Sequence, residues 1–273
     1  MAITKTSQTT QQGQAREQTN PTGQTVHVPA QTPQSSESTG WPKVSVVIPT
    51  LNEARNLEHV FAAFPAGLHE VILVDGHSVD GTPDVARRLR PDVRVISQTR
   101  TGKGNALACG FAAATGDIIV MIDADGSTDP AEIPRFVEAL TAGADFAKGS
   151  RFVPGAGSSD ITPLRRLGNR LLGLAVNVLY GTRYSDLCYG YNAFWTKHAP
   201  VFGLKTESPG QRPLWGDGFE IETVLNLRAS AAGLAVTEVP SFEYARIHGT
   251  SNLRTLRDGQ RVLRTILTEW MRA

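Results

Sequence analysis

The sequence predicts an α/β fold, with a mostly parallel, twisted β-sheet flanked by helices. From residue 43 onward, apolar runs of strand length alternate with helical stretches, which is the pattern of successive strand–helix–strand units. The first run, Val44–Ile48, is apolar apart from Ser45, as expected of a strand buried on both faces. Three runs lead into polar residues, which predicts a ligand crevice at the carboxyl edge of the sheet.

The strands of the first half are short runs rich in β-branched residues. They are expected at Val44–Ile48, Val71–Val74, Val93–Ile96, Ile118–Asp123 and from Asp145 onward. Helices between them imply right-handed crossovers, so the carboxyl ends of the strands meet at one edge. We therefore expect the loops Pro49–Glu53, Asp75–Asp80 and Asp123–Asp125 to lie together.

Helices are indicated by apolar residues at helical spacing and by their start signals. They are expected at Glu53–Phe64, Asp80–Leu89, Asn105–Ala114, from Pro130, and at Leu164–Leu179, Glu220–Arg228 and Leu256–Trp270. Asp80 suits an N-cap, and Pro130 suits a first turn because its missing N–H is not needed there. Short strands are expected at Ala235–Val239 and Phe242–Ala245.

The composition divides the chain into three parts. Residues 1–41 are rich in Gln, Thr, Ser, Gly and Pro, and cannot bury enough apolar surface to offset the entropy of ordering. We expect this segment to be a disordered tail and 42–255 to form the α/β domain. Residues 256–273 are expected to form an amphipathic basic helix that either docks on its own domain or lies on a membrane surface.

Charge and cysteine content exclude several functional classes. The 273-residue chain has a formal net charge of +1, which predicts no bulk attraction to nucleic acid. Its two cysteines, Cys109 and Cys188, are too far apart for a zinc motif and fit a reducing cytosol. No apolar run reaches the roughly 18–20 residues of a membrane span, and no secretory signal is indicated. We expect a cytoplasmic protein, in peripheral contact with the inner face of the membrane at most.

Asp123 and Asp125 follow an apolar run and are themselves followed by Gly126. In an extended strand, side chains two apart point to the same side, so the two carboxylates would converge. Two such carboxylates repel unless a cation lies between them, and Mg²⁺ or Mn²⁺ with oxygen ligands is the usual solution. The alternative is a solvated turn, in which Asp and Gly are ordinary residues.

An ordered series of motifs runs from residue 44 to about 253. The motifs are Val46–Glu53, Val74–Thr82, Gly102–Ala106, Asp123–Gly126, Gly149–Phe152, Asp186–Tyr191, Gly218–Glu222 and Arg246–Asn252. In this order they resemble the family 2 glycosyltransferases of the GT-A fold, and among these the dolichol- and polyprenyl-phosphate mannose or glucose synthases. The resemblance implies a Rossmann-like nucleotide half followed by an acceptor half.

The resemblance also implies roles for individual residues. The base and ribose of a nucleotide sugar would be bound by Pro49, Leu51, Glu53, Val74, Asp75, Lys103, Asp123 and Ala124. Asp125, assisted by Asp123, would hold the metal at the diphosphate leaving group. Plain alternatives exist, because Glu53 and Asp75 also suit first-turn acids, and Lys103 suits a solvated surface position.

Phosphates of the donor or acceptor would contact Arg151, Arg246 and Asn252, since a guanidinium binds phosphate oxygens in pairs. Arg165 and Arg166 either extend this basic rim or are helix-surface charges. A base for a hydroxyl acceptor is sought among Glu220, Glu222 and Asp217. In a helix, Glu220 and Glu222 cannot share a face, so only one would point into the cleft.

These expectations favour a metal-dependent, inverting transferase that moves a sugar from a nucleotide sugar, of the UDP-glucose or GDP-mannose type, to a polyprenyl phosphate or related acceptor. One alternative is a transferase of the same fold that acts on a hydroxyl of a polysaccharide or secondary metabolite. A nucleotidyltransferase also uses paired acids and Mg²⁺, but it usually has a Gly-rich loop after the first strand, which Pro49–Glu53 lacks.

Overall fold

The computed structural model describes residues 18–19, 25–26, 41–209, 212–249 and 255–272. The chain divides into two units, 1–41 and 42–273. In the first unit the described residues form two short antiparallel strands, β1 (Gln18–Thr19) and β2 (Thr25–Val26). The predicted disorder of this tail otherwise concerns residues outside the described ranges.

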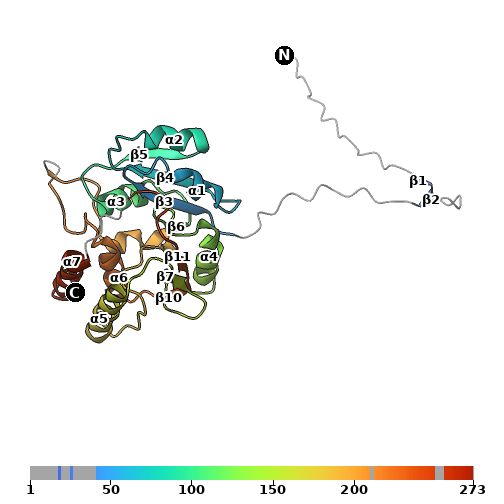
Figure 1. Ribbon diagram of the computed structural model, residues 1–273. Coiled ribbons are helices and arrows are strands. Elements are labelled where there is room, and N and C mark those ends of the chain that lie inside the picture. The colour runs from blue at the N-terminus through green and yellow to red at the C-terminus, as the bar shows by residue number, and fades with distance from the viewer. Residues whose placement is uncertain (1–17, 20–24, 27–40, 210–211, 250–254, 273) are drawn as a thin grey trace, which may run out of the picture. The chain divides into compact units, whose positions relative to one another are not determined.

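The second unit is built on a seven-stranded sheet (Figure 1). Its strands are β3 (Val44–Thr50), β4 (Glu70–Asp75), β5 (Arg94–Ser97), β6 (Ile118–Met121), β7 (Phe146–Ser150), β9 (Asn192–Trp195) and β10 (Val236–Pro240). The spatial order is β10-β7-β9-β6-β3-β4-β5, and β9 alone is antiparallel to its neighbours, as far as the described strands show. The expected mostly parallel sheet is confirmed. A second, two-stranded parallel sheet joins β8 (Gly157–Ser158) to β11 (Phe242–Glu243).

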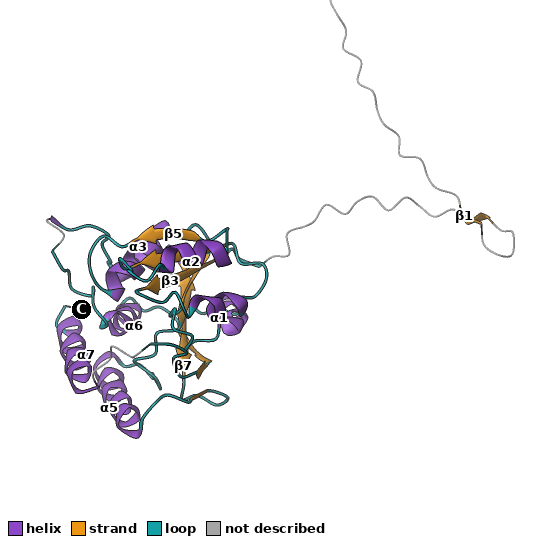
Figure 2. Cartoon of the chain, turned by 45° about the horizontal axis from the view of Figure 1, so that its top comes forward, coloured by secondary structure: helices purple, strands orange, loops and turns teal. Residues whose placement is uncertain are grey.

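Helices cover both faces of the large sheet (Figures 1 and 2). They are α1 (Leu57–Ala62), α2 (Thr82–Leu89), α3 (Lys103–Ala113), α4 (Ile133–Thr141), α5 (Pro163–Tyr180), α6 (Ile221–Ala231) and α7 (Thr255–Trp270), with 3-10 helices η1 (Pro130–Glu132) and η2 (Thr196–Phe202). One core cluster joins the sheet to α1, α2 and α4, and another joins it to α3, α6 and η2. A third, smaller cluster joins α5, α6 and α7. No described helix is long and apolar enough to cross a membrane.

Among the boundaries that differ from the sequence-based prediction, three lie close to the predicted loops at the sheet edge. The helix expected from Glu53 begins only at Leu57, after a turn. Gly81, with a φ of 82°, is the N-cap of α2 in place of Asp80, although Asp80 Oδ1 does accept a bond from the Thr82 N–H at 3.0 Å. Strand β6 ends at Met121 and not at Asp123, so the two acids lie in the turn that follows the strand.

Candidate functional site

The site lies at the carboxyl edge of three adjacent parallel strands, β6, β3 and β4. Backbone bonds join the loops that leave these strands. The Gly76 N–H donates to Thr50 O at 2.7 Å, and the Asn52 N–H donates to Ser78 Oγ at 2.9 Å. The Ile247 N–H from the far end of the chain donates to Asp125 O at 3.2 Å. The expected gathering of the three loops at one edge is confirmed.

Lys103 connects two acids from separate elements. Its Nζ lies 2.6 Å from Asp123 Oδ1 and 2.5 Å from Glu222 Oε1. Lys103 is the first residue of α3, and Glu222 lies in the first turn of α6. Because the two side chains are paired, the N-terminal ends of the two helices lie close together. The lysine side chain is only 13% exposed, which excludes a solvated surface lysine.

The charges of this cluster are coupled. Burial alone would lower the pKa of Lys103, but Asp123 and Glu222 outweigh it and hold that pKa above its ordinary value. Burial raises the pKa of Glu222; Lys103 opposes the rise, while Asp123 adds to it. The lysine therefore stays charged, and Glu222 is the acid of the pair that takes a proton more readily than an exposed glutamate.

Arg246 connects a second pair of acids. Its Nη2 lies 3.1 Å from Asp125 Oδ2, and its Nη1 lies 2.9 Å from Glu53 Oε1. Asn56 holds both Glu53 and the chain that follows Arg246. Its amide nitrogen donates to Glu53 Oε2, and its Oδ1 accepts a bond from the His248 N–H. Burial raises the pKa of Glu53, against the opposing effects of Asn56 and Arg246. Residues 246–248 are thus held against the turn Asp123–Asp125, which we call the acid turn.

Two glycines allow these close approaches. A Cβ on Gly104 would lie 1.7 Å from Gly216 O, so only glycine lets the start of α3 meet the loop that precedes α6. Gly126 has a φ of 79°, and a Cβ there would lie 2.5 Å from Ile247 Cδ1. Both glycines bring distant segments against the acids.

The acid turn has the donor chemistry that suits Mg²⁺ or Mn²⁺. Asp123 and Asp125 offer carboxylate oxygens that are 31% and 17% exposed, and each now faces a cation, Lys103 or Arg246. Within the described residues no group of three or more His, Cys, Asp or Glu could hold a metal, so solvent or substrate oxygens would complete the coordination. The ring of His248 lies near His59, at 6.0 Å between centroids.

The other candidate bases point elsewhere. Both oxygens of Asp217 accept bonds from Arg100, at 2.8 and 2.9 Å. Glu220 is the N-cap residue of α6 and lies 3.8 Å from Arg261. Of the three acids, only Glu222 contacts Lys103, and which of them acts as a base stays a prediction.

Arg151 lies within the protein and not at a phosphate rim. It is 6% exposed, and its guanidinium bonds Asp186 at 2.7 and 2.9 Å and Glu243 at 3.0 Å. Arg165 pairs with Asp160 at 2.9 Å. Asn252 lies outside the described residues, so its predicted phosphate contact stays a prediction.

The residues of the predicted base and ribose pocket differ in accessibility. Leu51 is 54% exposed and follows β3 directly, and Pro49 is the half-buried last-but-one residue of that strand. Asp75 is 6% exposed and accepts a bond from the Ser78 N–H at 3.1 Å. The side chains of Val74 and Ala124 lie in the hydrophobic cores, so neither can offer a side-chain contact to a nucleotide.

Several partners of the site residues were not expected from the sequence. They are Asn56, Arg100, Asp186 and Glu243. Asp186 begins the motif Asp186–Tyr191 of the family resemblance, so the sequence did contain a signal that this residue is important. The pairs Arg100–Asp217 and Arg151–Glu243 join residues more than ninety positions apart, and no local spacing indicates such contacts.

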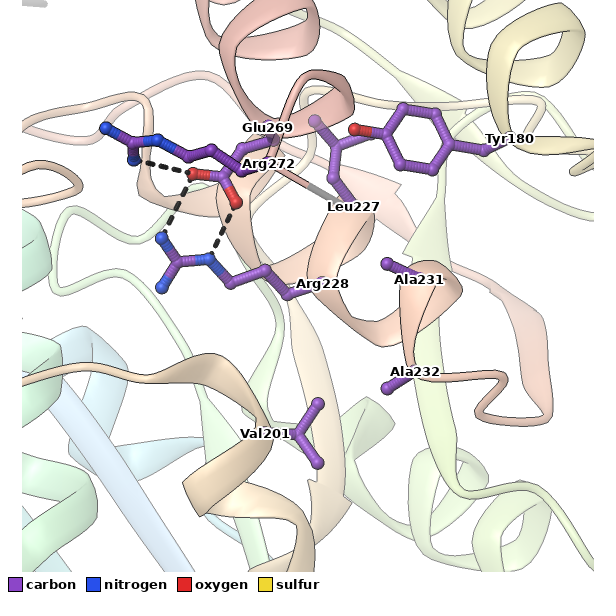
Figure 3. A pocket seen from close by; sticks show the side chains of 8 residues that line it. All are labelled: Tyr180, Val201, Leu227, Arg228, Ala231, Ala232, Glu269 and Arg272. Atoms are coloured by element: carbon purple, nitrogen blue, oxygen red, sulfur yellow. Dashed lines mark hydrogen bonds and ion pairs between the residues drawn. The ribbon is translucent and has the colours of Figure 1, made fainter.

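A cavity at another place in the described part of the chain does not contain the site. It has a volume of about 400 Å³ and lies among α5, α6, α7 and η2. Figure 3 shows Glu269 on its wall, held between Arg228 and Arg272, with Tyr180 opposite. No predicted site residue lines it, so we place the function at the sheet edge, where the acids and cations converge.

Known proteins share both this sequence pattern and this fold. Residues 45–199 match the family model "Glycosyl transferase family 2". Glycosyltransferase AglJ of Haloferax volcanii is 32% identical over 79% of this chain and 68% of its own length. Polyprenol monophosphomannose synthase of Mycolicibacterium smegmatis is 34% identical over 76% of this chain and 80% of its own. Some other relatives are matched over less than half of their length.

Among solved structures, glucosyl-3-phosphoglycerate synthase of Mycobacterium tuberculosis, determined with Mn²⁺ and uridine-diphosphate-glucose, superposes with a TM-score of 0.64. It is 26% identical, and the match covers 84% of this chain and 79% of that one. The expected GT-A type of fold is confirmed, and the nucleotidyltransferase alternative is set aside. A matched stretch that spans more than half of the chain, a shared fold and an acid turn at the sheet edge lead to one conclusion: the chain belongs to glycosyl transferase family 2 and is a glycosyltransferase.

Proposed function

We propose that this protein is an inverting, metal-dependent transferase that moves a sugar from a nucleotide sugar, of the UDP-glucose or GDP-mannose type, to a polyprenyl phosphate. One observation carries the proposal. Asp123 and Asp125 meet Lys103 and Arg246 at the edge where parallel sheets bind ligands. Relatives named polyprenol monophosphomannose synthase and undecaprenyl-phosphate mannosyltransferase support the lipid-phosphate acceptor.

The chain's own residues bind and orient the donor in this proposal. Asp125, with Asp123, would hold Mg²⁺ or Mn²⁺, which supplies positive charge to a diphosphate leaving group. Arg246 would turn from Asp125 to a phosphate, because its two-pronged guanidinium suits phosphate oxygens. The loop that contains Arg246 would then exclude water from the activated sugar.

An anionic phosphate acceptor needs no base, so Glu222 would act through Lys103. The Glu222 carboxylate would hold the ammonium group of Lys103 at the acid turn. Lys103 Nζ lies 2.5 Å from Glu222 Oε1. We further propose a cytoplasmic location, with peripheral contact at the inner face of the membrane, since a polyprenyl phosphate is embedded in the bilayer.

A hydroxyl acceptor is the second candidate, and the position of Glu222 favours it. The carboxylate lies beside the acid turn, and burial raises its pKa above the ordinary glutamate value, which favours a general base. Two variants discriminate between the acceptors. A lipid-phosphate enzyme should lose turnover in Arg246→Ala and tolerate Glu222→Gln better than a hydroxyl enzyme, which should fail in Glu222→Gln.

The test begins with a thermal-shift panel of UDP-, GDP- and dTDP-sugars with Mn²⁺, followed by product analysis with the best binder. Asp125→Ala should reduce transfer by roughly a hundredfold or more while the protein stays folded, since the metal charge is lost at the leaving group. Asp84→Ala, which removes an exposed acid of α2, is the matched control and should leave turnover unchanged. Full transfer by Asp125→Ala, or by the wild type in excess chelator, would refute the metal-dependent function.

A further inference from the structure

The outward face of α5 is apolar. Five large aliphatic residues are between 54% and 74% exposed: Leu164, Leu167, Leu171, Leu174 and Val178. Their spacing of three and four residues puts them on one side of the helix. The opposite side, with Val176, is buried in the core that α5 shares with α6 and α7. An ordinary surface helix turns its polar side to solvent, so α5 has the reverse pattern.

Helix α7 extends this surface. It lies beside α5 in Figures 1 and 2, and both helices contribute to the same core cluster. Its exposed large residues are Leu263, Leu267 and Trp270, with Met271 just beyond the helix, at 45% to 73% exposure. We call these residues and the five of α5 the apolar face. Exposed apolar residues gathered in this number on two packed helices mark a binding surface more often than bare solvent contact.

Most of the charged residues beside the apolar face are basic, and the acids Asp160 and Glu269 there are paired with Arg165 and with Arg228 and Arg272. Helix α5 contains no acidic residue and three arginines, Arg165, Arg166 and Arg170, of which the last two are exposed. Arg264 and Arg272 are exposed beside the apolar residues of α7. Basic residues that flank leucine and tryptophan complement an anionic lipid surface. Two copies joined through this face would instead bring like charges together.

We propose that the apolar face docks the protein on an anionic lipid bilayer, with α5 and α7 lying in the plane of the interface. Neither described helix can cross a membrane, which fits surface binding by side chains alone. Trp270 suits the headgroup region, where an amphipathic ring is favoured. This inference rests on the proposed function only for the reason to dock, namely an acceptor that resides in the bilayer.

The docking helix also positions a segment of the site. Asn169, on the buried side of α5, accepts bonds from the N–H groups of Leu187 and Cys188 at 3.2 and 3.1 Å. Gly190, two residues after Cys188, packs directly against the pair formed by Lys103 and Glu222. A Cβ atom added to this glycine would lie 3.2 Å from Glu222 Oε1 and 3.3 Å from Lys103 Nζ. The helix on the bilayer would therefore hold the chain that runs directly to the acid–lysine cluster.

Flotation of the full chain with vesicles tests the proposal. The wild type should bind phosphatidylcholine vesicles that contain phosphatidylglycerol, and binding should weaken as salt is raised. The triple variant Leu167→Glu/Leu171→Glu/Leu174→Glu should bind on the order of a hundredfold more weakly, because it places charges in the apolar layer. The matched control is Val79→Glu, at an apolar residue that is 90% exposed but outside the face, and it should bind like the wild type.

A second variant guards against misfolding of the first. Arg166→Gln/Arg170→Gln keeps the leucines, and should lower binding to anionic vesicles about fivefold for each arginine. Its binding to phosphatidylcholine alone should not change. Unchanged melting temperatures would show that both variants are folded.

The outcomes separate this inference from the proposed function. Equal binding by the wild type and the triple variant, or no binding by the wild type, would overturn the docking face. A wild-type dimer that becomes a monomer in the triple variant, with no vesicle binding, would assign the face to a second copy. Transfer to a short, water-soluble polyprenyl phosphate should persist in the triple variant. If vesicles bind but no polyprenyl phosphate is ever glycosylated, the face stands and the proposed acceptor falls.

Discussion

At the scale of single residues, two cations hold four carboxylates at the acid turn. Lys103 pairs with Asp123 and Glu222, and Arg246 pairs with Glu53 and Asp125. Four acids in so small a volume would repel one another without these partners. The site is therefore charge-compensated by its own residues, and the proposed metal ion would compete with Arg246 for Asp125.

Removal of Lys103 should make stability depend more strongly on pH. In Lys103→Met, Glu222 loses the partner that opposes the rise of its pKa, so the folded state binds a proton more readily than the unfolded chain does. Stability should then fall as the pH rises from the ordinary glutamate value of 4.5 through the raised pKa. At neutral pH the loss should be about 3 kcal/mol, as for other broken buried pairs.

Urea unfolding across a pH series measures this effect. The double variant Lys103→Met/Glu222→Gln is the control, since it removes the buried charge and should recover part of the lost stability. A pH dependence equal to that of the wild type would show that Glu222 does not depend on Lys103.

Arg151 offers a second residue-scale prediction, which separates a structural arginine from a phosphate ligand. Arg151→Met leaves Asp186, whose exposure is 0%, without its ion-pair partner. We expect a loss of about 3–5 kcal/mol of unfolding free energy, with nucleotide-sugar affinity unchanged in the folded fraction. Chemical denaturation and calorimetric titration measure the two quantities. An unchanged stability with lost affinity would restore the phosphate-binding interpretation.

At the scale of elements, the start of α3 is positioned by its contact with the loop before α6. The Gly104 N–H donates to Asp217 O at 2.8 Å, and Arg100 bonds the side chain of the same aspartate. This contact brings Lys103 to Glu222, because each residue lies in the first turn of its helix. The junction of two helix starts, and not either helix alone, forms the acid–lysine cluster.

Gly104→Ala should therefore damage this junction. Its Cβ would need the space of Gly216 O, and we expect a loss of about 1–3 kcal/mol of stability together with reduced turnover. Gly168→Ala in α5 is the matched control, because no atom lies within 4 Å of its Cβ position. That change should be neutral or stabilise by up to about 1 kcal/mol. Similar melting temperatures for the two variants would contradict the close contact.

At the scale of the whole molecule, the unit 42–273 contains the complete sheet, its covering helices and the acid turn. A truncated chain that starts at Trp41 should keep the melting temperature and turnover of the full chain, because residues 1–40 have the composition of a segment without a core. Thermal unfolding and a transfer assay on both chains provide the measurement. A large loss in either would show that the tail stabilises the domain.

The local pattern of apolar residues was sufficient to predict most of the strands and helices. Strands β3, β4 and β5 and helices α5 and α7 were predicted within a few residues, because apolar periodicity is itself a local property. It could not reveal β9, a four-residue strand whose antiparallel place between β6 and β7 depends on partners far away in the chain. The acids were found from their spacing, but the cations that pair with them depend on tertiary contacts.

The position of β9 also has a consequence for biosynthesis. As the chain leaves the ribosome, β6 can pair with β3 at once, but its other edge has no partner until residues 192–195 have been made. Strand β7 waits for the same segment before it can join the sheet. During that interval two buried-type strands have open hydrogen-bonding edges, which is the arrangement most prone to pairing with other nascent chains. The strand that joins the two parts of the sheet thus also sets how long the free edge of β6 can pair with other nascent chains.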